Sequence, residues 1–178
     1  MLIAGDDLPV QVTHIPGITR VRYTNSTKQD VRLVTAGEDH LVRLLPSEPT
    51  ATDVIPLVME DATQNISWIE ANNKYLVTAS EDGAVRLYQH ALQSEDDPQK
   101  ATSCIRIVRR EVLPVRCVSL ERATESPRAA ICSDELIIRV ASVEDPRQIT
   151  LLTGHTRGVR SASWSPILPL LVSCGSDG

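Results

Sequence analysis

LVTAGEDHLVRLL, residues 33–45, and LVTASEDGAVRLY, residues 76–88, are the two stretches that decide the fold of this chain. They are identical at nine of their thirteen positions and begin 43 residues apart. Each contains an apolar run, a polar turn and a second run in which apolar and polar residues alternate, which predicts a β-hairpin. A hairpin that recurs at a spacing of about forty residues indicates a repeat architecture.

The acidic residue in the turn marks further copies of this hairpin. Asp39 and Asp82 are 43 residues apart, and so are Asp134 and Asp177. In the third copy Glu135 fits the turn position better than Asp134, because the apolar run that follows is then in register. The chain therefore divides into four units, at residues 14–50, 51–90, 104–145 and 150–178.

The stretch 91–103 separates the second unit from the third and is polar and acidic, which predicts a lengthened surface loop. Each unit begins with a strand and continues through a second strand, the turn and a third strand, and the fourth unit ends before its third strand. Residues 52–60 and 103–111 are either outer strands or connections between units. The sequence leaves both possibilities open.

The second strand of each unit is the most informative element. YLVTA (75–79), AAIC (129–132) and LLVSC (170–174) are runs of apolar and small residues without alternation. Such a strand has both faces covered. In an antiparallel protein this happens when small sheets stack face to face around an axis. The predicted fold is therefore all-β, and residues 1–178 form part of a propeller of about four blades, the last one incomplete.

Composition narrows the function. The chain is 42% hydrophobic and only 3% aromatic, and its net charge of −5 gives no overall field for nucleic acid phosphates. The opening MLIAGDDLPV is not a secretory signal and no apolar run is long enough for a bilayer, so we expect a soluble intracellular protein. The four cysteines lack metal-site spacing and are expected to be free, buried thiols.

These residues resemble the WD-repeat propeller family. The best match is GHTRGVRSASWSPILPLLVSCGSDG, residues 154–178. The resemblance implies a structural hydrogen-bond network in each unit, made by a His before the first strand, a Ser or Thr in the second and an Asp in the turn. The residues that would form it are His155, Ser173 and Asp177 in the fourth unit, His14, Thr35 and Asp39 in the first, and Thr78 and Asp82, without a matching His, in the second.

A narrower resemblance covers nearly the whole chain and is most specific over residues 136–178. The opening HIPGITRVRY (14–23) and the later ELIIRVASVEDPRQITLLTGHTRGVRSASWSP (135–166) are similar to the N-terminal propeller of the chromosome transmission fidelity protein 4 family, whose animal members are called acidic nucleoplasmic DNA-binding protein. This implies a nuclear scaffold of the replication fork that links the replicative helicase to the polymerase α–primase complex and supports sister-chromatid cohesion. Chromatin or DNA association would then belong to the full-length protein. The alternative is a generic WD-repeat adaptor, such as a ubiquitin-ligase substrate receptor or a subunit of an RNA-processing complex.

No pattern in the chain predicts catalysis. The His, Ser and Asp residues recur with each unit, whereas a nucleophile serves one site, and no G-x-S-x-G elbow is present. We expect no cofactor, metal, membrane or small-molecule substrate. Arg43, Arg86 and Arg139 recur in the third strands and are expected to pair with a carboxylate or reach water. Near the rim of the channel, four residues are candidates for binding a protein partner: Glu38, Glu81, Arg157 and Ser176.

Overall fold

The computed structural model of the chain describes residues 15–24, 32–46, 57–72, 74–89, 106–121, 126–145 and 147–178. His14 and the predicted loop 91–103 lie outside these ranges. Within them the chain forms β-strands and no helix, hence none long and apolar enough to cross a membrane.

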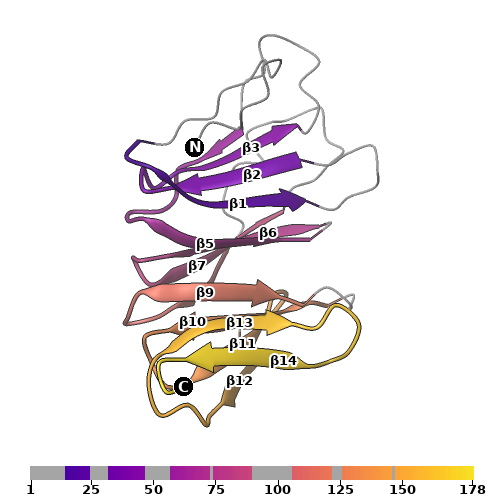
Figure 1. Cartoon of the computed structure of the whole chain (residues 1–178). Coiled ribbons are helices and arrows are strands. Elements are labelled where there is room, and N and C mark those ends of the chain that lie inside the picture. Colours follow the sequence, from indigo (N-terminus) through magenta and orange to yellow (C-terminus); the bar gives the residue numbers. More distant parts are fainter. Residues whose placement is uncertain are drawn as a thin grey trace.

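The strands form three sheets of four strands and one of two, all antiparallel (Figure 1). The first sheet consists of β1 (Ile18–Thr24), β2 (Arg32–Gly37), β3 (Val42–Pro46) and β4 (Leu57–Met59). The second consists of β5 (Ile66–Ala71), β6 (Tyr75–Ser80), β7 (Ala84–Gln89) and β8 (Arg106–Arg110). The third consists of β9 (Val115–Leu120), β10 (Arg128–Ser133), β11 (Ile138–Ser142) and β12 (Ile149–Leu152). The last pair is β13 (Val159–Trp164) and β14 (Leu171–Gly175).

The fourth strand of each sheet answers the question that the sequence left open. β4 pairs with β3, and β8 pairs with β7, so both ambiguous segments contain outer strands. β12 pairs in the same way with β11. The later sequence units are therefore staggered by one strand relative to the sheets, since the outer strands β4, β8 and β12 lie at the start of a unit but pair with the preceding sheet. This stagger ties neighbouring sheets together through the chain itself.

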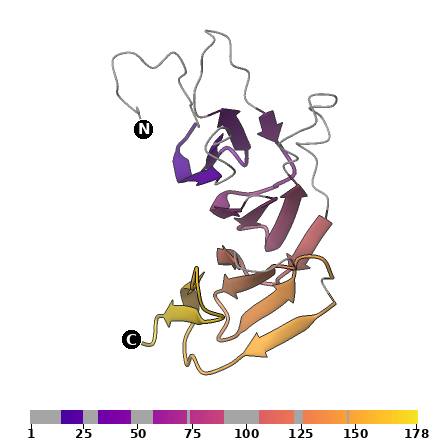
Figure 2. The ribbon, with the colours of Figure 1, turned by 90° about the vertical axis from the view of Figure 1, so that its right-hand side faces the viewer.

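The sheets stack along an arc, with their first strands on its concave side (Figure 2). Three apolar clusters fill the spaces between successive sheets. Every residue of β6 is buried, as its unbroken apolar sequence predicted, because a sheet lies on each side of it. In β14 burial alternates instead, and Val172 is 71% exposed, because this strand has a neighbouring sheet on one face only.

Hydroxyl groups on the first strands also link neighbouring sheets. The Thr19 hydroxyl lies 2.6 Å from the carbonyl oxygen of Ile66 in the next sheet and 3.1 Å from that of Ala36 in its own. The Ser67 hydroxyl does the same one sheet further on, at 2.5 Å from the carbonyl oxygen of Val115. Each site coincides with a β-bulge, which turns the carbonyl groups toward the hydroxyl. The spacing of the sheets is therefore fixed by polar contacts as well as by apolar packing.

Candidate functional site

One end of the stack carries the hairpin turns and the loops that lead into the first strands. We call this end the turn rim; it comprises residues 15–17, 38–41, 60–65, 81–83, 111–114, 134–137, 153–158 and 176–178. The antiparallel order of the strands places all these segments at the same end, on the left in Figure 1. The rim holds most of the residues that the sequence singled out.

In the fourth unit the structure brings His155, Ser173 and Asp177 together. The imidazole Nδ1 of His155 lies 2.9 Å from Asp177 Oδ1, and its Nε2 lies 2.9 Å from the Ser173 hydroxyl. The backbone N–H of Thr156 donates to Asp177 Oδ2 at 2.7 Å. His155 and this N–H lower the pKa of Asp177 to about 2. The carboxylate thus ties the hairpin turn to the loop before β13.

The second unit anchors its turn differently. Arg86 donates to both oxygens of Asp82, at 3.1 and 2.7 Å. The N–H groups of Thr63 and Ala84 and the Thr63 hydroxyl also donate to this carboxylate. Burial by itself raises the pKa of Asp82, but the bonds from Arg86 and the two amides outweigh it and hold the pKa well below its usual range. Thr78 is not part of this network, and its buried hydroxyl has no hydrogen-bond partner in the described part of the chain.

The first unit resembles the second, as far as the described residues show. Asp39 accepts from the N–H of Leu41 at 3.2 Å and from Arg43 at 2.7 Å. Thr35 is buried in β2, and the proposed partner His14 lies outside the described ranges.

The third unit uses a longer side chain at the turn. Glu135 takes the anchor position, and its carboxylate lies 2.6 Å from Arg139. Arg139 also pairs with Glu111, a carboxylate that is only 2% exposed, at 3.1 Å. The prediction that the third-strand arginines pair with carboxylates is confirmed in all three sheets.

Strand register explains why the units differ. Ile66 and Val159 begin equivalent strands, opposite Ser80 and Gly175. By this alignment Ala62 occupies the place of His155 and Thr78 the place of Ser173. Thr78 therefore has no imidazole nitrogen with which its hydroxyl could form the equivalent hydrogen bond. The sequence shows this Ala directly, but only the register identifies its position.

The residues proposed to bind a partner lie on the turn rim. Glu38, Arg157 and Ser176 are exposed, and Glu81 has a side-chain exposure of 37%. Glu81 lies 3.4 Å from Arg116, and Ser176 accepts from Arg160 at 2.9 Å. Both of these arginines come from first strands.

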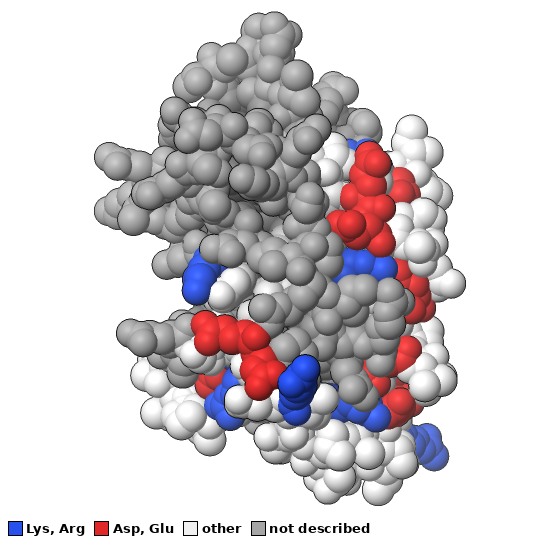
Figure 3. All heavy atoms as spheres, turned by 180° about the vertical axis from the view of Figure 1, so that it is seen from behind, with Lys and Arg blue, Asp and Glu red and all other residues white. Residues whose placement is uncertain are grey.

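Asp134 connects the two arginines. Arg116 donates to Asp134 Oδ2 at 2.7 and 3.0 Å, and Arg160 lies 3.4 Å from Asp134 Oδ1. The bond from Arg116 lowers the pKa of Asp134. Glu81, Arg116, Asp134, Arg160 and Ser176 thus form a continuous polar chain over three successive sheets, which we call the rim chain. Seen from behind, the edge of the molecule that carries the turn rim shows a mixture of acidic and basic side chains, on the right in Figure 3.

Sequence reasoning missed Arg116, Asp134 and Arg160 as members of this site. A signal was present, since both arginines occupy the first-strand position that Thr19 and Ser67 hold in the earlier units. At this position Thr19 and Ser67 have short hydroxyl side chains that link two sheets. An arginine at the same position is long enough to reach the rim.

The cysteines were expected to be free and buried, and this holds for two of the three that the structure describes. Cys117 and Cys132 are buried and lie directly opposite each other on β9 and β10, but Cys174 is exposed. The expectation that it is buried was wrong, because none of the described strands covers the outer face of β14. A hydrogen bond from the Cys132 thiol lowers the pKa of Cys117. Among the described residues no group of three His, Cys, Asp or Glu side chains is placed to hold a metal ion.

Comparison with known proteins identifies the repeat. Residues 61–89 and 146–178 match the family model described as WD domain, G-beta repeat. The WD40 β-propeller domain of Doa1 superposes with a TM-score of 0.68 at 14% identity, over 90% of this chain and 48% of that one. The chain is therefore a partial WD-repeat β-propeller, as its sequence predicted.

Two relatives share sequence with it. Minichromosome loss protein 1 of Schizosaccharomyces pombe is 28% identical over 164 residues, which are 92% of this chain and 18% of that protein. Peroxisome biogenesis protein 7 of Arabidopsis thaliana is 29% identical over 77 residues, 43% of this chain and 24% of that protein. The chain thus spans only a minor part of the length of either relative.

Proposed function

We propose that this partial WD-repeat β-propeller is a non-catalytic, protein-binding module of a nuclear scaffold that acts at the replication fork. In this role it links the replicative helicase to polymerase α–primase and supports sister-chromatid cohesion. The observation that carries the proposal is the similarity to Minichromosome loss protein 1, which runs through 92% of the chain. The name of that relative refers to the loss of chromosomes, an outcome expected when their replication or cohesion fails.

The turn rim supports a protein-binding role. WD40 propellers are generally non-catalytic scaffolds for protein–protein interaction. The rim chain holds alternating charges, and several of its members are partly exposed, so it offers directional contacts to a partner with complementary charge. It does not offer the single-sign surface that phosphate-backbone binding requires.

The test is affinity capture from nuclear extract with the wild-type chain and with Glu38→Lys and Glu81→Lys. We expect helicase and polymerase α–primase subunits in the wild-type capture and a clear loss with the variants. Glu144→Lys is the matched control, because Glu144 is an exposed carboxylate at the opposite end of the sheets. Capture that is identical for all three variants would exclude Glu38 and Glu81 as contacts.

The match to Peroxisome biogenesis protein 7 favours a second candidate, a WD-repeat adaptor without a role in replication. The cellular location of the tagged full-length protein separates the two. Enrichment on chromatin during DNA synthesis supports the replication scaffold. Absence from the nucleus throughout the cell cycle rejects it in favour of the adaptor.

A further inference from the structure

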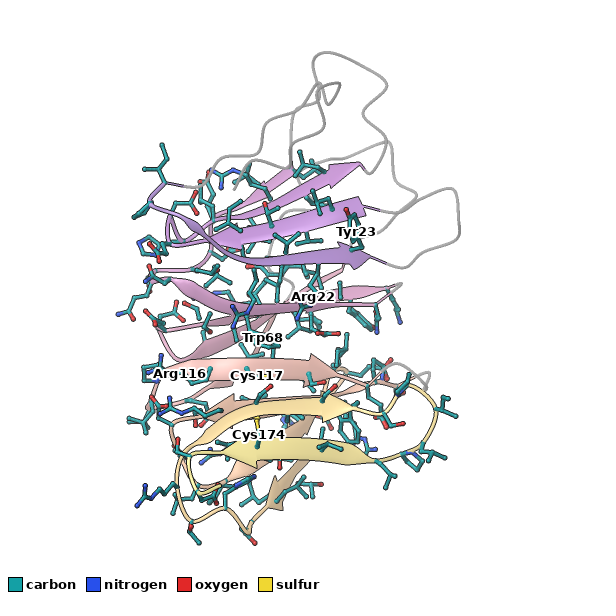
Figure 4. All side chains as sticks on the ribbon, viewed as in Figure 1. Arg22, Tyr23, Trp68, Arg116, Cys117 and Cys174 are labelled. Atoms are coloured by element: carbon teal, nitrogen blue, oxygen red, sulfur yellow. The ribbon has the colours of Figure 1, made fainter. Side chains whose placement is uncertain are left out.

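A second polar site lies on the concave side of the stack, away from the turn rim. The guanidinium carbon of Arg20 lies 4.4 Å from the ring centroid of Trp68, and that of Arg22 lies 5.4 Å from the same ring. Glu70 is near, with its carboxylate 3.8 Å from Arg22 Nε. Figure 4 shows both residues near the middle of this face, Arg22 beside β1 and Trp68 on β5, toward β9. We call these four residues the Arg–Trp shelf.

Among the described residues, the guanidinium of Arg20 has no anionic partner. Its Nη1 donates to the backbone carbonyl of Thr19 at 2.8 Å, and its Nε is buried without a hydrogen-bond acceptor. No carboxylate of the described residues lies within ion-pairing distance of it. A guanidinium donates to carboxylates through two adjacent N–H groups, and a buried donor without an acceptor is unfavourable. Arg20 can therefore donate hydrogen bonds to an acceptor on another molecule.

A comparison within the molecule shows what a satisfied site of this type looks like. Arg128 stacks over the ring of Trp164 at 4.8 Å. It donates from Nε and Nη2 to Glu121, both at 2.8 Å. An arginine stacked on tryptophan therefore has a bidentate carboxylate at Arg128 and none at Arg20 among the described residues.

We infer that the Arg–Trp shelf binds a carboxylate side chain of an acidic segment in a partner protein. The inference rests on the proposed function as a protein-binding module. The charges define the ligand: two guanidinium groups and one carboxylate leave a net charge of +1, which one carboxylate neutralises and a phosphate dianion exceeds. A nucleic acid strand presents a series of phosphates, for which this isolated pair of cations, with Glu70 beside it, is a poor match.

Trp68 makes the binding directly measurable. The chain has two tryptophans, so Trp164→Phe leaves Trp68 as the only one. In this background a short Glu-rich peptide is titrated and Trp68 emission is followed. A Gln-rich counterpart, a phosphoserine peptide and single-stranded DNA are titrated in parallel. We expect saturable binding of the Glu-rich peptide that weakens about tenfold or more in Arg20→Gln, from the loss of a charge-assisted hydrogen bond.

Two further variants protect the test from misfolding. Glu70→Gln removes the competing carboxylate and is expected to strengthen peptide binding several-fold, a gain that an unfolded chain does not produce. Arg128→Gln is the matched control and is expected to leave binding unchanged, because Arg128 already has its carboxylate. The inference is overturned if Arg20→Gln binds like the wild type, if the Gln-rich peptide binds equally well, or if phosphoserine or DNA is the preferred ligand. If the peptide does not bind at the shelf while capture through the rim is intact, only this inference is refuted, and the proposed function stands.

Discussion

The buried ion pair of Asp82 and Arg86 gives the sharpest test of how the turns are held. The side chains are 8% and 5% exposed, and the pair is bidentate. Removing one partner from a buried pair costs about 3–5 kcal/mol, because the other charge loses its compensation. Asp82→Ala also removes the acceptor for the N–H groups of Thr63 and Ala84. For a chain of this length we expect the Tm to fall by on the order of 10 °C.

A double-mutant cycle separates the pair from the rest of the turn. Arg86→Met removes the cation but keeps an apolar stem, and Asp82→Ala/Arg86→Met removes both charges. We expect the double variant to be more stable than the sum of the single losses predicts, by about 1–3 kcal/mol. Asp61→Ala is the control, since Asp61 is an exposed carboxylate of the same rim and should change stability by less than about 0.5 kcal/mol. Unfolding is followed by heat and by denaturant.

The pH dependence of stability gives an independent test of the Asp82–Arg86 ion pair. The pKa of Asp82 lies below its ordinary value of 3.8 in the folded chain, so its contribution is complete above that value and is lost as the pH falls through the folded pKa. The stability difference between wild type and Asp82→Ala should therefore shrink on acidification below about pH 4. If Asp82→Ala matches Asp61→Ala, or if the cycle is additive, the ion pair does not hold the turn and the reasoning fails.

Three further outcomes follow from the same contacts. Thr78→Val replaces a buried, unpaired hydroxyl with a methyl group and should leave the Tm unchanged or raise it, whereas Ser173→Ala should cost about 1 kcal/mol by thermal unfolding; equal losses would contradict the contrast between the units. Gly83→Ala should destabilise by about 2 kcal/mol or more in denaturant titration, because φ is +80° and the new Cβ would meet the Glu111 carbonyl oxygen; an unchanged midpoint would show that the turn relaxes. Asp177→Asn should flatten the loss of stability between pH 3.8 and about 2, since His155 depresses the carboxyl pKa only in the folded chain; a profile identical to that of the wild type would remove Asp177 from the acid response.

The sequence was sufficient for the fold because the repeat is local. The hairpin at 33–45 and its copy at 76–88 carry their own turn chemistry, and the apolar second strands predict coverage on both faces. The choice of Glu135 over Asp134 was also accessible, because the Arg four residues later pairs with it. The three-residue outer strand β4 could not be predicted, because so short a run shows no alternation of apolar and polar residues. Only its pairing with β3 defines it as a strand.

The site was less accessible because its contacts join distant residues. Arg139 meets Glu111 across a loop, and Arg20 meets Trp68 across two sheets. Neither pair has a spacing rule, since the approach of the side chains depends on how far one sheet is rotated against the next. Sequence reasoning therefore located the rim through Glu38 and Glu81 but did not anticipate the rim chain or the Arg–Trp shelf.

The anchor of each turn explains how a rigid frame coexists with a variable rim. A turn and the loop beside it both end at the rim, where neither has ladder partners, so a carboxylate that accepts from their N–H groups joins them. Asp177 does this with Thr156, and Asp82 does it with Thr63 and Ala84. Because each aspartate anchor accepts from main-chain donors, the cation that joins it differs between units, and the residue just before the anchor does not take part in holding the turn. Those positions hold three kinds of side chain in the four units: Glu38, Glu81, Asp134 and Ser176. Variation at fixed points on a stiff support is what recognition of a particular protein partner requires.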